Sequence, residues 1–338
     1  MNKNLKIVAG IILVFGIFCT YSKAFAKNIV QLPNDLSNKL NPQITTEILP
    51  DSNNFKTEAA KSFNLNILTF NCWGVPKILF YEPTKDQKER FKNIVPVING
   101  YDVVNLQETF SDNANIIIEG VDYPYKIRHN NTSLASYGSG LMSFSKYKII
   151  KKGFKKFSQC AGADCFSNKG IFFMRIKVPQ IGDLDIYNTH YQAIEDKEQI
   201  RISANKEFSD FLKENDVGNL TIMTGDFNFA NYDSNDKSSK AYTDFIKRFD
   251  PVDTFRIKNL DLSGFTNDFH INNYVSKDDK PQRLDYIFIL SANSNLTKKS
   301  KYNFEVLDSK VVFTQPVNGK FLSDHFGLTT TLKINLLD

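Results

Sequence analysis

The stretch Leu220 to Asn228, LTIMTGDFN, is the one from which the fold can be worked out. A short apolar run rich in β-forming residues reaches a glycine, after which an aspartate and an asparagine stand two positions apart. The run predicts a buried strand that stops at a cleft. Residues two positions apart in extended chain point the same way, so Asp226 and Asn228 would reach together into one polar pocket. The alternative is an Asx-type turn that closes the strand, because Gly, Asp and Asn are ordinary turn residues.

The pattern of an apolar run with a polar end recurs along the chain. We expect strands at 65–70, 102–106, 184–190, 284–290 and 326–334, and amphipathic helices at 86–99 and around 200–211. Pro96 should shorten or kink the first helix. Polar side chains stand at the strand ends: Asn71, Glu108, His190, the Asp226/Asn228 pair, Asp285 and the Asp324/His325 pair. Each has a structural explanation when taken alone, but their joint placement predicts a site.

Composition predicts one large globular domain. The chain has 338 residues, of which 41% are hydrophobic and 13% aromatic. Residues 27–62 are rich in Asn, Ser, Pro, Thr and Lys without periodicity, which indicates a flexible arm. We therefore expect the domain at 63–338, with two packed sheets flanked by helices, and we expect a monomer.

The first 26 residues predict a secretory signal peptide. Lys3 and Lys6 precede an apolar run from Ile7 to Phe18, and Ala24 and Ala26 stand at the −3 and −1 positions of a cleavage site. The run is shorter than the roughly 20 residues of a membrane-spanning helix. Removing this segment lowers the formal charge from +5 to +2, because it contains three lysines and no acids. So small a charge does not indicate a nucleic-acid-binding protein.

An exported protein can form disulfides. We expect a small loop closed by Cys160 and Cys165 rather than two free thiols, and we expect Cys72 to be a buried thiol.

The residue types at the strand ends suit attack of water on a phosphodiester. A carboxylate such as Glu108 can hold a hard divalent cation. One histidine, oriented by a carboxylate, can take a proton from water, while another donates hydrogen bonds to the phosphate. Oxygen ligands with imidazoles and no thiolates indicate Mg²⁺ or a similar divalent ion. Which acid supports which histidine is left open.

The motifs NCWG, QE, NTH, GDFN, LDY and SDH occur in the order found in the endonuclease/exonuclease/phosphatase superfamily, which this sequence resembles from about residue 65 to 334. The resemblance implies a four-layered α/β sandwich of the deoxyribonuclease-I type. Within the superfamily the chain is most similar to secreted bacterial neutral sphingomyelinases. The signatures are Trp73-Gly74-Val75-Pro76, Tyr137-Gly138-Ser139-Gly140-Leu141 and Asn168-Lys169-Gly170.

The resemblance also implies a role for each motif residue. It makes Glu108 the principal Mg²⁺ ligand with Asn71 beside it, and His325 next to Asp324 the general base. His190 would stabilise the transition state, Asp226 and Asn228 would orient the phosphate or hold a second ion, and Asp285 would orient a histidine. Asp164 and Lys169 have the spacing of a charged pair that switches the site in some family members, although a solvated loop is the alternative.

The expected function is hydrolysis of sphingomyelin at a membrane surface. A secreted deoxyribonuclease on the same fold and a non-catalytic lipid- or receptor-binding module are the alternatives. The secreted bacterial enzymes that it resembles often dock on membranes through an exposed hairpin with paired aromatic residues, whereas this chain has a single tryptophan, Trp73, which belongs to the first motif. Phe80 and Tyr81 could substitute as a membrane wedge or belong to the core.

Overall fold

The structure is a computed structural model and describes residues 62–76, 84–129, 132, 136–232, 239–290 and 294–337. The predicted signal peptide lies outside the described residues, as do Phe80, Tyr81 and the predicted arm except for Ser62. Within the described part of the chain, no helix is both long and apolar enough to cross a membrane.

In the part of the chain that the structure describes, twelve strands form two six-stranded sheets. Sheet 1 has the order β11-β12-β1-β2-β4-β3, and sheet 2 has the order β5-β6-β7-β8-β10-β9. The strands of sheet 1 are β1 (Ser62–Asn71), β2 (Val103–Gln107), β3 (Tyr125–His129), β4 (Leu141–Ser145), β11 (Tyr302–Val312) and β12 (Gly327–Leu336). Those of sheet 2 are β5 (Lys148–Lys156), β6 (Gly170–Val178), β7 (Gly182–His190), β8 (Leu220–Asn231), β9 (Pro251–Asp253) and β10 (Arg283–Leu290).

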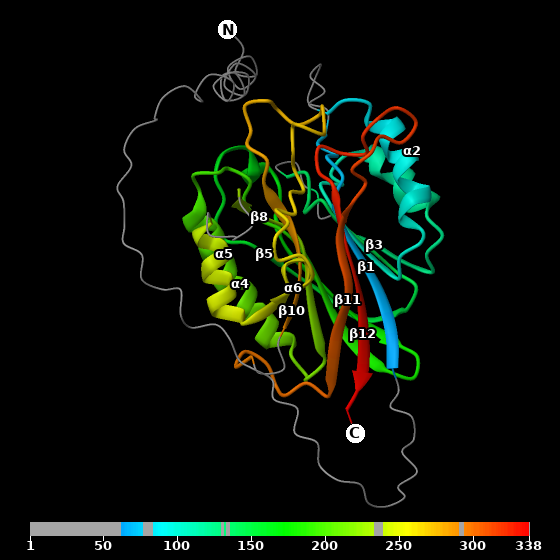
Figure 1. Cartoon of the computed structure of the whole chain (residues 1–338), viewed down its shortest axis with the longest axis vertical. Helices are drawn as coiled ribbons and strands as arrows, with labels where there is room; N and C mark the ends of the chain where they lie inside the picture. Colours follow the sequence, from blue (N-terminus) through cyan, green and yellow to red (C-terminus); the bar gives the residue numbers. More distant parts are fainter. Residues whose placement is uncertain are drawn as a thin grey trace, which may run out of the picture. The chain divides into compact units, whose positions relative to one another are not determined.

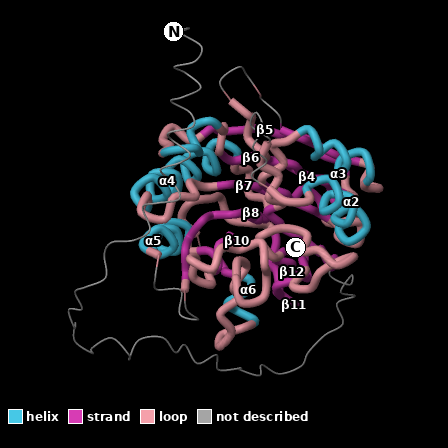
Figure 2. Tube along the Cα trace, turned by 90° about the horizontal axis from the view of Figure 1, so that it is seen from above, coloured by secondary structure: helices cyan, strands magenta, loops and turns pink. Residues whose placement is uncertain are grey.

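Helices cover the outer face of each sheet, so the fold has four layers (Figures 1 and 2). The α-helices are α2 (Gln87–Ile98), α3 (Asn115–Gly120), α4 (Glu198–Asn215), α5 (Lys240–Phe249) and α6 (Thr254–Lys258), and two short 3₁₀ helices are η1 (Asp112–Ala114) and η2 (Gly162–Phe166). Figure 2 shows α4 and α5 on one flank and α2 and α3 on the other. This confirms the predicted α/β sandwich.

Three apolar clusters hold the layers together. Aliphatic side chains such as Ile67, Ile186 and Ile222 fill the space between the sheets. The aromatic face of α4 and α5, including Phe208 and Phe245, packs on sheet 2. The corresponding side chains of α2 and α3 pack on sheet 1 together with Cys72, which is a buried free thiol as expected. Burial of these faces at about 25 cal/mol per Å² is the main force that assembles the sandwich.

Some elements differ from the sequence prediction. The strand expected to stop near Gly225 continues to Asn231, because β10 pairs with it along this stretch. Helix α2 covers Gln87–Ile98, close to the predicted range of 86–99, and contains Pro96. The polar region after residue 230 contains α5, β9 and α6.

The edge strand β5 is strongly basic. It carries the exposed residues Lys148, Lys151, Lys152, Lys155 and Lys156 and no acid. It pairs only with β6, so its other side is an open edge of sheet 2 within the described structure.

Candidate active site

A row of side chains crosses three neighbouring strands of sheet 2. His190 on β7 pairs in register with Asp226 on β8, and Asp226 pairs with Asp285 on β10. Directly paired residues on neighbouring strands point to the same face of a sheet. Gly225 permits the close approach of β7 and β8, since a Cβ there would lie 2.1 Å from the Thr189 carbonyl oxygen. The register therefore brings one imidazole and two carboxylates together.

Sheet 1 brings Asn71 and Glu108 to the same place. β1 and β2 run parallel with Asn71 opposite Gln107, so Glu108 follows directly at the end of β2. The Asn71 amide nitrogen donates to Asp226 Oδ2 at 2.9 Å and to Glu108 Oε1 at 3.2 Å. His190 Nε2 lies 3.5 Å from Asp226 Oδ2 and 3.8 Å from Glu108 Oε1. The ends of the two sheets thus meet at one polar centre.

The backbone is left-handed at three residues of this centre. The φ angles are 48° at Trp73, 54° at Glu108 and 50° at Asn228. A non-glycine residue pays about 1–2 kcal/mol for this conformation, and such strain is concentrated at functional sites. The left-handed conformation of Glu108 comes directly after Gln107, the last residue of β2, and ends that strand.

The left-handed Asn228 gives the GDFN motif the Asx-type contact that the sequence analysis considered as an alternative. The Asn228 backbone N–H donates to Asp226 Oδ1 at 3.0 Å, which is an Asx-type contact, and its side-chain nitrogen donates to the Tyr191 carbonyl at 3.1 Å. Asp226 faces the centre, whereas the side chain of Asn228 bonds to backbone. The same Tyr191 carbonyl accepts from Lys169 Nζ at 2.8 Å, so the Asn228 amide lies beside Lys169, and a direct role for Asn228 stays a prediction.

His325 is held by Asp285 rather than by its neighbour Asp324. Its Nδ1 lies 2.8 Å from Asp285 Oδ2, while Asp324 Oδ1 accepts from the Ser323 hydroxyl at 3.1 Å. Burial opposes a charge on His325, but Asp285, Asp226 and Asp324 together outweigh burial and raise the pKa of His325 well above its usual value. Asp285 fixes Nδ1, so Nε2 is the nitrogen that a reactant can use.

His190 is paired with Lys169. The Lys169 ammonium lies 2.9 Å from His190 Nε2, 2.8 Å from the Tyr191 carbonyl oxygen and 3.0 Å from Asp164 Oδ2. An ammonium group only donates, so His190 Nε2 accepts and the ring proton lies on Nδ1. Burial, Lys169 and His325 lower the pKa of His190 well below its usual value, which keeps the ring neutral.

The predicted pair of Asp164 and Lys169 is thus an ion pair. The two side chains are only 18% and 9% exposed, so they do not belong to a solvated loop. Asp164 Oδ2 also accepts from the Ala193 backbone N–H at 2.7 Å. Whether the pair acts as a switch stays a prediction.

The acidic side chains at the centre fit a divalent cation. Burial and Asp324 raise the pKa of Glu108 to about 7, and burial and Asp285 raise that of Asp226 to about 6. Among the described residues, Glu108 Oε2 and Asp285 Oδ1 are buried and have no hydrogen-bond partner. Asp226, Asp285 and His325 also offer ligand atoms within 4.8 Å of one another. Buried carboxylate oxygens without donors are the ligands that a hard cation such as Mg²⁺ prefers.

Asn71 is oriented with its nitrogen toward these carboxylates. Its Oδ1 accepts from the Trp73 backbone N–H at 2.9 Å, and its Nδ2 faces Glu108 and Asp226. A cation takes an amide oxygen, so coordination by Asn71 would require its side chain to turn over. Its place as a metal ligand stays a prediction, and Asp226 and Asp285 are further candidates.

The motifs and their geometry match a known family. The Endonuclease/Exonuclease/phosphatase family model matches residues 68–325, a range that contains every residue described above from Asn71 to His325. The chain belongs to this family.

Two curated relatives and one solved structure show which members of the family the chain is similar to. The "Putative neutral sphingomyelinase" of Drosophila melanogaster is 28% identical over 81% of this chain. The match spans 62% of that protein's length. The "Inositol phosphosphingolipids phospholipase C" of Schizosaccharomyces pombe is 27% identical over 82% of this chain and 70% of its own length. A beta toxin variant from Staphylococcus aureus, solved with bound magnesium ions, superposes with a TM-score of 0.60 at 23% identity, covering 79% of this chain and 99% of the toxin. At that identity the superposition shows a shared fold.

A buried polar network links the two sheets behind the family motifs. Gln107 Nε2 on β2 donates to Asn188 Oδ1 on β7 at 2.7 Å. Asn188 Nδ2 donates in turn to the carbonyls of Leu106 and Met142 at 3.1 and 3.2 Å. The sequence analysis did not single out these two amides, although both occur inside the QE and NTH motifs. Gln107 Oε1 is buried without a partner among the described residues, so the network is joined through the two amide nitrogens, and these bonds tie the end of β2 to the end of β7.

One arginine of α2 joins two segments that carry motif residues. The buried Arg90 guanidinium donates to the carbonyls of Cys72 at 2.9 Å, Trp73 at 2.9 Å and Leu322 at 2.8 Å. Cys72 and Trp73 follow β1, and Leu322 precedes the Ser-Asp-His segment. No sequence signal marks Arg90, because an arginine on an amphipathic helix is ordinarily a surface residue.

The predicted disulfide between Cys160 and Cys165 is confirmed, with the Cα atoms 5.2 Å apart. It closes the loop that contains Asp164. The next residue after the bridge, Phe166, accepts from the Tyr137 backbone N–H at 2.9 Å. The disulfide loop is therefore tied to the Tyr137-to-Leu141 signature.

Proposed function

We propose that the protein is a secreted, Mg²⁺-dependent phosphodiesterase that hydrolyses sphingomyelin to ceramide and phosphocholine. The observation that carries this proposal is that the carboxylates of Glu108 and Asp226 lie together with two pairs, Asp285–His325 and Lys169–His190. Phosphodiester hydrolysis needs a cation site, a base for water and positive charge at the phosphate. Residues suited to each need lie at this one centre.

Glu108 and Asp226, with Asp285 beside them, would hold the cation. When bound, Mg²⁺ supplies positive charge that offsets these carboxylates, lowers the pKa of His325 and polarises a phosphodiester oxygen. The raised pKa values of Glu108 and Asp226 are those expected of acidic groups crowded together without such charge.

His325 is the proposed base. A base must be unprotonated, and the charge of Asp226 and Asp324 favours the protonated ring in the arrangement described. Once that charge is offset, Nε2 can take a proton from water while Asp285 holds Nδ1 and stabilises the imidazolium that forms. Asp324 contributes negative charge rather than a hydrogen bond to the ring.

Lys169 and His190 supply the positive side of the centre. With Lys169 on Nε2, His190 is an acceptor and cannot donate to a phosphate oxygen. For His190 to stabilise the transition state as predicted, Lys169 must move off this nitrogen. A rearrangement of the Asp164–Lys169 pair would provide that change, which supports the proposal that the pair is a switch.

The substrate is inferred from the relatives and the sequence signatures. The two curated relatives are named for phospholipases on sphingolipids with different head groups. Export is inferred from residues 1–26 and accords with a lipid substrate in an outer membrane leaflet. The +2 charge of the mature chain argues against a nucleic-acid substrate.

The test compares three substrates at equal enzyme and Mg²⁺ concentrations: sphingomyelin vesicles, phosphatidylcholine vesicles and supercoiled plasmid DNA. We expect phosphocholine release from sphingomyelin to dominate and chelator to abolish it. Glu108→Gln serves as the inactive control for contaminating hydrolases. Efficient nicking of DNA without phosphocholine release would overturn the substrate and support a nuclease, and no turnover of any substrate would support a binding module.

A further inference from the structure

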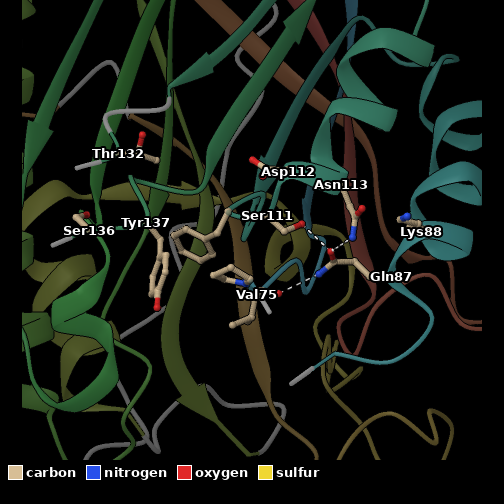
Figure 3. A pocket seen from close by; sticks show the side chains of 11 residues that line it. Val75, Gln87, Lys88, Ser111, Asp112, Asn113, Thr132, Ser136 and Tyr137 are labelled. Atoms are coloured by element: carbon tan, nitrogen blue, oxygen red, sulfur yellow. Dashed lines mark hydrogen bonds between the residues drawn. The ribbon is translucent and has the colours of Figure 1, made fainter. Parts of the chain in front are cut away.

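Residues from two signatures of the sequence that have no role in the site described so far line one cavity. Val75 and Pro76 come from the first signature, and Tyr137 comes from the second. The segment from Phe110 to Asn113, which follows Glu108 in the chain, also lines the cavity. The cavity measures about 580 Å³, which is the size of a small-molecule site. Figure 3 shows Tyr137 and Ser136 on one side of it and Gln87 and Lys88 on the other.

The cavity lies next to the reaction centre. The Phe110 ring centroid is 6.5 Å from that of His190. The Thr109 backbone N–H donates to the Gly140 carbonyl at 2.9 Å, which ties the segment after Glu108 to the second signature. A Cβ at Gly74 would lie 2.3 Å from the Glu108 carbonyl oxygen, so only glycine lets the first signature pack there. Phe110 lines the cavity and neighbours His190, so a ligand with its phosphate at Glu108 and His190 would reach the cavity past Phe110.

Gln87, in the polar wall of the cavity, has no hydrogen-bonding capacity left for a ligand. Gln87 Oε1 already accepts from the Ser111 hydroxyl at 2.6 Å and from Asn113 Nδ2 at 2.7 Å. Its Nε2 donates to the carbonyl of Val75 at 3.0 Å and to the Thr84 hydroxyl at 2.9 Å. These bonds are visible as dashed lines in Figure 3 for the residues drawn. A ligand group that forms no hydrogen bonds with water gives up none when it enters the cavity beside Gln87.

The opposite wall suits a cation that forms no hydrogen bonds, such as a quaternary ammonium group. Phe110 and Tyr137 offer aromatic rings, and Tyr137 is 39% exposed, so its ring is accessible. Asp112 adds a carboxylate to the lining, which also attracts the guanidinium of Arg128. Aromatic faces with a nearby carboxylate are the usual surroundings of quaternary ammonium groups. Lys88 lies across the cavity from Tyr137 and would place the positive end of the ligand on the aromatic side (Figure 3).

We propose that this cavity holds the trimethylammonium end of a choline head group against Phe110 and Tyr137. The proposal rests on the proposed function, because it takes the phosphate to lie at Glu108 and His190. It also explains a choice among sphingolipid head groups. Ethanolamine and inositol head groups would need hydrogen-bond partners other than the saturated Gln87, whereas the trimethylammonium group needs none.

The experiment compares phosphocholine with phosphoethanolamine, which differ only in the three N-methyl groups. Binding of each to the full protein with Mg²⁺ is measured by isothermal titration calorimetry. We expect phosphocholine to bind about fivefold more tightly or better, and Tyr137→Leu to remove most of this preference. The matched control is Phe166→Leu, since Phe166 is 44% exposed in the neighbouring loop but does not line the cavity. It should keep the preference.

Hydrolysis of sphingomyelin and ceramide phosphoethanolamine is measured in parallel to separate the two proposals. Turnover of both lipids with equal kcat/KM, together with equal binding of the two head groups, would overturn the cavity assignment and leave the function standing. A phosphocholine preference that Tyr137→Leu leaves intact would also overturn it. A preference that Tyr137→Leu abolishes, in a protein that hydrolyses neither lipid, would uphold the cavity and reject the function.

Discussion

Glu108 binds a proton in the pH range where it would have to bind a cation. Its pKa is raised to about 7 because its carboxylate is buried near Asp324. A cation therefore has to displace this proton below neutral pH, and its affinity rises as the pH rises through 7. We expect Mg²⁺ or Mn²⁺ to bind about tenfold more tightly at pH 8 than at pH 6, as follows for one group of that pKa.

Calorimetric titration of the parent and of Glu108→Gln at both pH values tests this. The variant should bind the cation more weakly and lose most of the pH dependence, because glutamine has no proton to displace. An unchanged affinity in Glu108→Gln would move the cation site to Asp226, Asp285 and His325, which form the other candidate group.

Substitutions of His325 and of Asp285 should affect kcat and its pH dependence differently. His325→Ala should lower kcat by about 10²- to 10⁴-fold, the usual contribution of a general base. Asp285→Asn keeps the shape of the group that contacts His325 Nδ1 but removes its negative charge. It should therefore lower kcat less than His325→Ala does, and it should lower the pKa of His325 that appears in the pH profile of kcat. Circular dichroism establishes that both variants fold. If His325→Ala keeps most of its turnover between pH 6 and 9, the base is another group.

At the scale of secondary structure, the segment after β1 and the one before β12 depend on α2 through Arg90. Removing its guanidinium leaves several buried carbonyl groups without donors, each at a cost of about 1–3 kcal/mol. We expect Arg90→Met to lower the free energy of unfolding by about 3 kcal/mol or more in urea titrations. Arg90→Lys should recover only part, because an ammonium group lacks the planar fork.

A surface arginine provides the control for this measurement. Arg248 of α5 makes an i,i+4 pair with Asp244 and is 30% exposed. Arg248→Met should cost less than about 0.5 kcal/mol. Equal losses in the two variants would mean that Arg90 contributes no more than an ordinary surface residue.

The ends of β1, β2 and β7 could be predicted from sequence because a polar residue, Asn71, Gln107 or His190, closes each apolar run, whereas β8 continues past its predicted end. The partner of His325 could not, since Asp285 lies on β10 of sheet 2, His325 lies just before β12 of sheet 1, and the two meet only where the sheets pack. Nor could the orientation of Asn228, which depends on one left-handed residue. β6 was missed because a continuous apolar run fits a buried helix as well as a strand. α5 did carry a signal, in the buried residues Ala241, Phe245 and Phe249 at helical spacing.

At the scale of the whole molecule, the candidate cation ligands come from both sheets. Glu108 follows a strand of sheet 1, whereas Asp226 and Asp285 belong to sheet 2. A ligand that binds only the folded arrangement stabilises it, by about 2.7 kcal/mol at a hundred times its Kd. We therefore expect Mg²⁺ to raise the Tm by several degrees in scanning calorimetry, and to raise that of Glu108→Gln much less. An equal rise in both proteins would show that the ion binds elsewhere.

The lysines of β5 determine what another copy of the protein meets at the open edge of sheet 2. An unpaired strand edge is a template for a strand of a second molecule, and repeated positive charge is a common way to prevent that pairing. Replacing Lys148, Lys152 and Lys155 with threonine should keep the strand but permit self-association, seen as light scattering that grows with protein concentration. Replacing the exposed Lys206 and Lys213 of α4 should not. If the β5 variant stays monomeric, the lysines do not protect the edge; if it aggregates, the parent should do so too in concentrated salt, where its charges are screened.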